Sequence, residues 1–405
     1  LQNESQLSNA QALHWSVILG RTGDEKRATE ILNRIAPDDQ KGYPPAHRVK
    51  AINLTDDYLK QNSDLNFQKV AFHLKNSDST DPELNRAWAI YFEAKGEPKK
   101  AIDYLINASQ TYPELYLTVA EIAQREGELT TRKEALNTCK FELTKRMVTE
   151  PLDVASRVNL ARCHIELEDF RSAEKVLNDG MAIQPTQVLR RSISNLYVMM
   201  LEEDGVTLST KLILLKEAIE IDNESPVPFN KLVELTTLGQ TEQEIQLAKQ
   251  NFQSVIATFG SGALDHCNLA FIYFQEGDEE EKDWHLNQAW RIDPTFGKIA
   301  HRLARAFTLS ETNPNSDWGL EIAKMAALKA PKEPIYRATL AEILLSRQEF
   351  KQAIAILNAT LSDTQDQTSI HRRLAYAYNK IGESKRASLH SRKADESEVI
   401  AANQE

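Results

Sequence analysis

The chain has 405 residues, and its 14 glycines are about half the usual glycine share of ~7%. So few glycines disfavour folds that need many tight turns, such as phosphate-binding loops and all-β sandwiches. The net charge of -11, without a run of basic residues, excludes the basic stripe typical of nucleic-acid binding and a strong grip on anionic membranes.

Apolar residues recur with helical spacing along almost the whole chain, and short breakers separate the apolar segments. One kind of breaker joins a glycine to an acidic residue, and the other kind contains a proline. Because the two kinds alternate, we expect a helix–turn–helix hairpin that repeats along the chain, with essentially no strand. The breakers contain Gly23, Gly96, Gly127, Gly277 and Gly382 on the one hand, and Pro113, Pro185, Pro294 and Pro331 on the other.

The segment 1–185 is predicted to be an N-terminal array of such hairpins. The first hairpin covers about 15–32, and a second covers about 46–75 after a proline-containing loop. The hairpin within 114–149 should have a longer second helix. The segment 152–185 is the most regular unit of the chain.

The rest of the chain divides into two parts. The segment 186–262 departs most from the pattern and is predicted to form degenerate helical hairpins. The segment 263–405 is a C-terminal array with a period of about 34 residues, and a surplus falls in the turn-like stretch 313–316. The last helix, about 383–401, is polar, as expected for a helix that caps such an array.

The units share a set of packing residues, which in 152–185 are Leu160, Ala161, Ala173, Leu177 and Pro185. This pattern resembles the tetratricopeptide repeat, W-x2-L-G-x2-Y followed by A-x3-F and P, with Ala in place of the Gly after the Leu. The resemblance implies an all-α, right-handed superhelical solenoid of about eleven hairpins, whose stacked neighbours bury one continuous core.

No catalytic or metal-binding constellation is evident. The nine histidines are scattered and lack a zinc-protease motif, and the acidic run 276–281 lacks the alternating ligands of a calcium loop, so helix capping accounts for it. Trp284 and Trp290 have helical spacing and are assigned to the core. We expect no catalytic residues, no metal and no cofactor. Three cysteines, far apart in sequence, are predicted to be free and to lie buried or half-buried in helices: Cys139, Cys163 and Cys267.

The family resemblance implies that the first helix of each hairpin lines a concave groove where partners bind. Carried over residue by residue, the C-terminal groove combines basic groups with aromatic anchors, which suits a peptide with acidic groups. An alternative for the same residues is a solvated wall held by intramolecular ion pairs, for instance to Glu342. The C-terminal groove positions are Phe271, Phe274, Lys298, His301, Arg305, Glu342, Arg372, Tyr376 and Asn379; those of the N-terminal array include Arg86, Ile90, Val158, Arg162 and Glu166.

The leading hypothesis is a non-enzymatic interaction scaffold that binds a protein or peptide, and no nucleic acid, in its concave groove. The alternative is the non-catalytic portion of a larger membrane-anchored or envelope-assembly protein or enzyme, because the sequence begins at Leu1 and not at Met. No run of 18 apolar residues predicts direct membrane insertion. The cysteine content fits a cytoplasmic or a periplasmic protein, and the sequence leaves the oligomeric state open.

Overall fold

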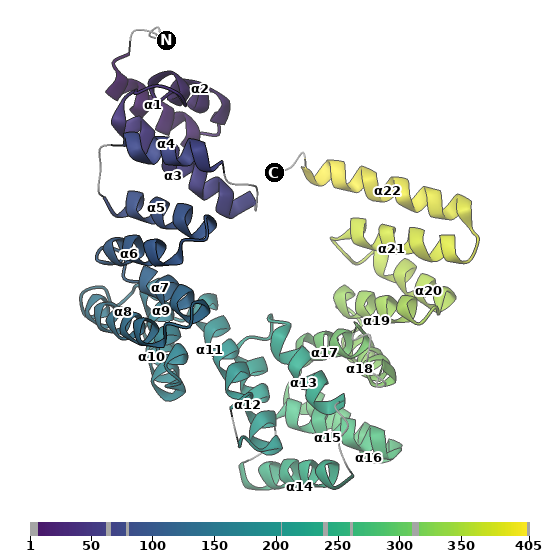
Figure 1. Ribbon diagram of the computed structural model, residues 1–405. Coiled ribbons are helices and arrows are strands. Elements are labelled where there is room, and N and C mark those ends of the chain that lie inside the picture. Colours follow the sequence, from purple (N-terminus) through teal and green to yellow (C-terminus); the bar gives the residue numbers. More distant parts are fainter. Residues whose placement is uncertain are drawn as a thin grey trace. The chain divides into compact units, whose positions relative to one another are not determined.

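The computed structural model describes residues 7–61, 66–77, 81–203, 205–237, 242–259, 262–309 and 316–402. Within these ranges the chain consists of helices joined by turns and loops, without a strand (Figure 1). The predicted all-α architecture of repeated hairpins is therefore confirmed. No helix in the described ranges combines the length and the apolar character needed to cross a membrane.

The first compact unit ends at Pro185. In it, each odd-numbered helix packs against the even-numbered helix that follows, and consecutive hairpins stack. In the fourth hairpin the second helix covers 21 residues and the first helix covers 11. The predicted extra length of the second helix is therefore confirmed. The helices are α1 (Asn9–Arg21), α2 (Glu25–Ile35), α3 (Pro44–Gln61), α4 (Phe67–Asn76), α5 (Pro82–Ala94), α6 (Pro98–Ser109), α7 (Leu115–Arg125), α8 (Leu129–Thr149), α9 (Val154–Glu166) and α10 (Phe170–Ile183).

The second compact unit begins at Thr186 and contains the remaining helices. Most of them form hairpins again, but α13 packs mainly against α11, α12 and α17, and α14 packs against α12 and α15. The helices are α11 (Gln187–Met200), α12 (Leu208–Ile221), α13 (Val227–Thr237), α14 (Glu242–Phe259), α15 (Ala263–Glu276), α16 (Glu279–Ile292), α17 (Gly297–Leu309), α18 (Ser316–Lys329), α19 (Pro334–Ser346), α20 (Phe350–Leu361), α21 (Gln367–Lys380) and α22 (Ser384–Ala402).

The turn inside a hairpin is built from one glycine and one capping residue. At Gly277 φ is 77°, in the left-handed region that glycine adopts without a steric cost, and the next amide donates a hydrogen bond of 2.9 Å to the carbonyl of Tyr273. The side chain of Asp278 then accepts a hydrogen bond from the amide of Glu281 and caps α16. The acidic run 276–281 is a capping turn, as the sequence predicted.

Small residues allow the helices of a hairpin to approach closely. Ala101, Ala173 and Ala353, near the start of the second helices, have no exposed surface, as the repeat pattern predicted. Gly319 in α18 acts in the same way, because a Cβ there would lie 2.8 Å from the carbonyl oxygen of Ala304 in α17. Larger side chains at these positions would overpack the interface at a cost of ~1–3 kcal/mol.

One core assignment from the sequence is wrong. Trp290 is buried, but 51% of Trp284 is exposed. The reason is the phase of α16, in which the neighbouring His285 takes the position that faces α15. The three cysteines are free and buried, as predicted. Of the stretch 313–316, where a surplus was expected, only Ser316 belongs to the described residues, and α18 begins there.

Candidate binding site

The predicted groove residues lie on α15, α17, α19 and α21, the first helices of successive hairpins. The structure divides them by exposure, so only part of the set is available to a partner. Lys298, Arg305, Arg372, Tyr376 and Asn379 are exposed, Phe274 and Glu342 are half-buried, and Phe271 and His301 are buried.

Phe271 does not serve as an exposed anchor, and its assignment to the groove surface is wrong. Its side chain is 5% exposed, and its ring centroid lies 5.4 Å from that of Phe307 and 5.7 Å from that of Trp318. Phe274 also contacts Trp318, at 5.3 Å between centroids. The following hairpin, α17–α18, therefore covers this part of α15.

His301 is not a basic group of the groove either. It is 8% exposed and lies beside the ring of Tyr336, with 5.4 Å between centroids. Burial, followed by the nearby positive charges of Arg302 and Arg305, lowers the pKa of His301 to about 4. The imidazole is therefore neutral at pH 7, and the expected cationic contact at this position is corrected.

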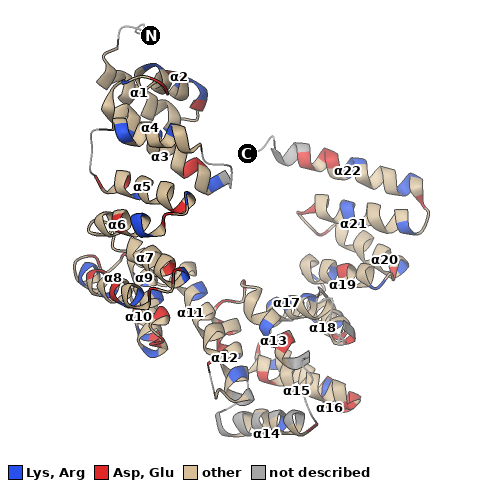
Figure 2. Cartoon of the chain, in the orientation of Figure 1, with Lys and Arg blue, Asp and Glu red and all other residues tan. Residues whose placement is uncertain are grey.

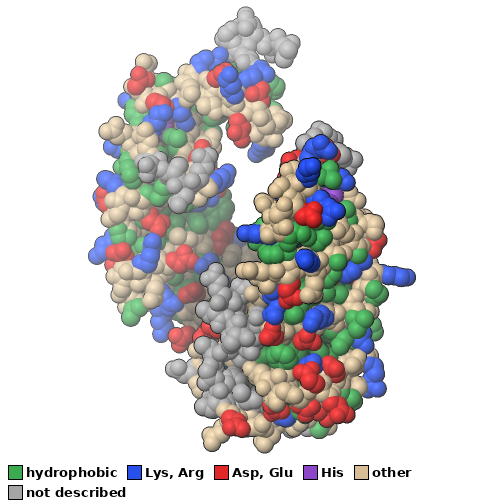
Figure 3. Space-filling view, turned by 90° about the vertical axis from the view of Figure 1, so that its right-hand side faces the viewer, with side chains coloured by type: hydrophobic (Ala, Val, Ile, Leu, Met, Phe, Trp, Pro, Cys, Tyr) green, Lys and Arg blue, Asp and Glu red, His purple; other side chains and the backbone are tan. Residues whose placement is uncertain are grey.

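Ion pairs connect the first helices of successive hairpins. On α19, Glu342 contacts Arg305 of α17 and Arg373 of α21, each at 3.3 Å, so the alternative of intramolecular ion pairs holds at this position. Figure 3 shows one face of the molecule, on which basic and acidic side chains are interspersed. In the first unit the corresponding pairs are Asp56–Arg86, Glu93–Arg125 and Glu121–Arg162.

A pocket of about 580 Å³ lies between α21 and α22, and we call it the terminal pocket. It brings together three predicted groove residues, Arg372, Tyr376 and Asn379, with Arg392 of α22. The Tyr376 ring is 49% exposed. The remaining lining residues are Ala375, Ala387, Ser388, Ser391 and Asp395.

The two arginines of the terminal pocket contact exposed carboxylates. Arg372 contacts Glu398 at 2.6 Å, and Arg392 contacts Glu396 at 3.5 Å, and all four side chains are largely exposed. Figure 2 shows basic residues along α21 and the first part of α22, and acidic residues near the end of α22. Such exposed pairs exchange readily, because each contributes only ~0–1 kcal/mol.

A second pocket, of about 470 Å³, lies on α5, α7 and α9 with part of α8 in the first unit. Its charged groups already contact one another, since Glu93 binds Arg125 at 2.5 Å and Arg132 binds Glu166 at 2.8 Å. Arg132 also donates to the main-chain carbonyl of Glu166. The side chains of Glu93 and Glu166 are less exposed than those of Glu398 and Glu396, so a partner replaces them less easily, and the terminal pocket is the stronger candidate.

Sequence reasoning missed the contribution of α22, because the last helix was assigned only to capping. A signal was present in the spacing of Ser388, Ser391, Arg392 and Asp395, which places them on one face of a helix. These residues form the second wall of the terminal pocket.

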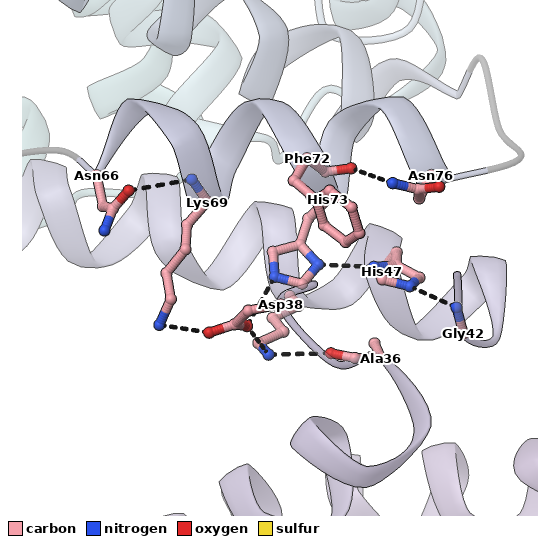
Figure 4. Close-up of polar contacts among 10 residues, drawn as sticks. Ala36, Asp38, Gly42, His47, Asn66, Lys69, Phe72, His73 and Asn76 are labelled. Carbon is pink, nitrogen blue, oxygen red and sulfur yellow. Dashed lines mark hydrogen bonds and ion pairs between the residues drawn. The ribbon is translucent and has the colours of Figure 1, made fainter. Parts of the chain in front are cut away.

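Sequence reasoning also missed three histidine pairs, each joining two helices of a hairpin. Their Nδ1 atoms lie 2.6 Å apart in His47–His73, 2.7 Å in His266–His285 and 2.9 Å in His371–His390. In the first pair, shown in Figure 4, His47 accepts from the amide of Gly42 and His73 contacts Asp38.

The other two histidine pairs belong to a motif that occurs twice with identical spacing. An amide side chain of the preceding helix donates to a tyrosine, and this tyrosine stacks on the second histidine. The regular spacing was the signal that could have revealed them. The two sets are Gln253, His266, Tyr273 and His285, and Asn358, His371, Tyr378 and His390.

The described part of the chain contains no cluster of three or more His, Cys, Asp or Glu residues arranged to hold a metal ion. Burial raises the pKa of the Cys267 thiol to about 12, so this cysteine is protonated and unreactive at pH 7. The candidate site consists of the terminal pocket, with Arg372, Arg392 and the ring of Tyr376.

No protein-family model and no curated protein matches the sequence. Among solved structures, the chain is similar to MamA (17% identity over 40% of this chain and 93% of that chain, TM-score 0.28). It is also similar to yeast Tom70 (12% identity, 97% and 96% covered, TM-score 0.29) and to a protective antigen of uropathogenic Escherichia coli with an SLR fold (14% identity, 98% and 95% covered, TM-score 0.32). All three TM-scores lie below 0.5, so the helical-repeat fold is assigned from the hairpins of this chain alone.

Proposed function

We propose that this chain is a protein-interaction scaffold of the tetratricopeptide type, without catalytic activity of its own, and that the terminal pocket binds an acidic segment of a partner protein. The observation that carries this proposal is the convergence of Arg372, Tyr376, Asn379 and Arg392 on one pocket. Two guanidinium groups, an exposed ring and an amide are the groups that recognise a peptide with carboxylates.

The chain's own carboxylates indicate how such a segment would bind. Glu398 and Glu396 occupy positions next to Arg372 and Arg392, so carboxylate groups fit there. Because these pairs are exposed and weak, a partner's carboxylates can replace them at a cost of only ~0–1 kcal/mol each. Tyr376 then supplies apolar contact area, and Asn379 can bond the peptide backbone.

A fluorescein-labelled peptide of alternating Glu and Leu residues tests this proposal by fluorescence anisotropy. The same peptide with Lys in place of Glu is the ligand control. We expect the acidic peptide to bind and the basic peptide not to bind. The double variant Arg372→Glu, Arg392→Glu should weaken binding by about tenfold or more.

Lys385→Glu is the matched control variant, because Lys385 lies on α22 like Arg392, is exposed and does not line the pocket. It makes the same charge change as either arginine substitution, and we expect it to change affinity by less than about twofold. Equal losses in the control and in an Arg372→Glu single variant would contradict a specific pocket and indicate only long-range electrostatic attraction.

A further inference from the structure

The terminal pocket and one histidine pair share the same two helices. His371 lies on α21 and His390 on α22, and their rings meet between the helices with 5.1 Å between centroids. The residues that follow them in sequence, Arg372 and Ser391, line the pocket. The contact between the two Nδ1 atoms therefore ties one wall of the pocket to the other.

This contact depends on how many protons the pair carries. When both rings are neutral, one Nδ1–H donates to the lone pair of the other Nδ1. A first additional proton leaves the hydrogen bond in place, because an imidazolium can donate its Nδ1–H to a neutral ring. A second additional proton removes the only acceptor and places two positive charges 2.9 Å apart at the Nδ1 atoms.

The surroundings of the pair oppose the charged state. Burial is the largest cause that lowers the pKa of His371 and of His390, and the positive charge of Lys393 on α22 lowers both further. The ring of Tyr378 on α21 stacks on His390, with 5.4 Å between centroids, and the guanidinium of Arg386 on α22 lies over the same tyrosine ring, 5.5 Å from its centroid.

The other groups around the pair are neutral or already paired. From α20, Asn358 donates its amide to the hydroxyl of Tyr378 and brings no charge. Arg372 of α21 is paired with Glu398 of α22, and both side chains are largely exposed. The ring of Tyr378, the amide of Asn358 and the cation Lys393 bring no negative charge that would stabilise a doubly protonated pair.

Resting on the proposed binding role of the pocket, we propose that the His371–His390 pair is an acid-sensitive switch. With at most one extra proton the pair holds α22 on α21, and with two it separates the helices, opens the terminal pocket and releases the bound acidic segment. The last hairpin suits this role because α22 packs against α21 as its main neighbour among the described helices.

Hydrogen–deuterium exchange of α22 in the full chain, without any ligand, tests the switch between about pH 7.5 and about pH 4.5. Rates are corrected for the intrinsic pH dependence of amide exchange. We expect the protection of α22 to fall by about tenfold or more in the wild type on acidification. His390→Gln keeps an amide that can bond His371 and cannot titrate, so its protection should change by less than about twofold.

Loss of protection to the same extent in the wild type and in His390→Gln, or full protection of the wild type at the acidic end, would overturn the proposal. Glu398→Gln serves as the control for the carboxylate that also titrates in acid. This variant should retain the acid response of the wild type, and loss of that response would assign it to the ion pair and not to the histidines.

A second measurement covers the case in which His390→Gln loosens α22 already at neutral pH. The imidazole resonances of wild-type His371 and His390 are then followed by NMR, and coupled titration in two steps is expected, with loss of α22 protection at the second. Independent single-step titrations with α22 still protected would refute the switch. Since neither experiment uses a peptide, failure of the switch and failure of peptide binding are distinguishable.

Discussion

The hairpins α15–α16 and α21–α22 carry the same histidine–tyrosine motif in different surroundings. In α15–α16, the hairpin α17–α18 lies against the motif's first helix, and Phe271 is 5% exposed. In α21–α22, the residue at the same position relative to the paired histidine is Tyr376, which is 49% exposed. One repeat position is therefore core in one hairpin and half-exposed surface in the other.

The difference teaches that a groove position is defined by the next hairpin as much as by its own helix. Trp318 of α18 fills the space beside Phe271 and Phe274, so this part of the predicted groove is closed. No helix within the described residues covers Tyr376 and Asn379 in this way, and a pocket forms there. Candidate sites in such arrays are therefore best sought where stacking is incomplete.

The largest expected effect comes from truncating the two equivalent aromatic residues. Phe271→Ala should lower the free energy of unfolding of the second unit by ~3–5 kcal/mol, because it leaves a cavity between Phe307 and Trp318. Tyr376→Ala is the matched control and should cost less than ~1 kcal/mol, since half of its ring is exposed. Urea unfolding followed by tryptophan fluorescence measures both. Similar losses of unfolding free energy would show that the two positions contribute equally to packing.

The next effect concerns the buried pair His266–His285. The pKa of His285 is lowered to about 4 by burial first and then by the charges of His266 and Lys249. The folded value lies below the unfolded value of 6.5, so the unfolded chain binds more protons between these two pH values. The contribution of His285 to the free energy of unfolding is therefore fully present above about pH 6.5. It declines by about 3 kcal/mol as the pH falls towards about 4.

Urea midpoints across this pH range measure that decline. The variant His285→Gln should lack this part of the pH dependence while keeping a group that can bond His266. A decline of the same size in the variant would assign the acid sensitivity to carboxylates elsewhere. It would show that the pair His266–His285 is not its source.

A smaller effect distinguishes two arginines on the predicted groove. Arg372→Glu alone should weaken binding of the acidic peptide by about tenfold, or ~1.4 kcal/mol, because Arg372 lines the terminal pocket. Arg305→Glu should change the affinity by less than about twofold, because Arg305 does not line the terminal pocket. Anisotropy titrations at one salt concentration compare them, and a larger loss for Arg305→Glu would move the site to α17.

The smallest effect tests the ion pairs between successive first helices. Glu342→Gln removes the partner of both Arg305 and Arg373, yet it should cost no more than ~1 kcal/mol because the arginines are partly exposed. The cost should largely disappear at about 1 M salt. Thermal unfolding at low and high salt measures it, with Glu121→Gln as the equivalent change in the first unit.

The sequence by itself determined the hairpins, their turns and their small residues. Gly277 and Asp278 act through hydrogen bonds to residues a few positions away, and Ala173 is fully buried near the start of its helix. Such contacts lie within one repeat, and the helical period together with turn chemistry predicts them. For the same reason, Arg372, Tyr376 and Asn379 were placed on one face of α21 from the sequence.

Only the tertiary structure decided which of these faces stay open and how charges and histidines pair. The burial of Phe271 by α17–α18 and the two contacts of Glu342 depend on residues of another hairpin. The pairing of His371 with His390 depends on the rotational phase of two helices, which a repeat pattern with an uncertain helix boundary does not define. Contacts between elements require the relative positions of those elements, and stacking of the hairpins supplies these positions.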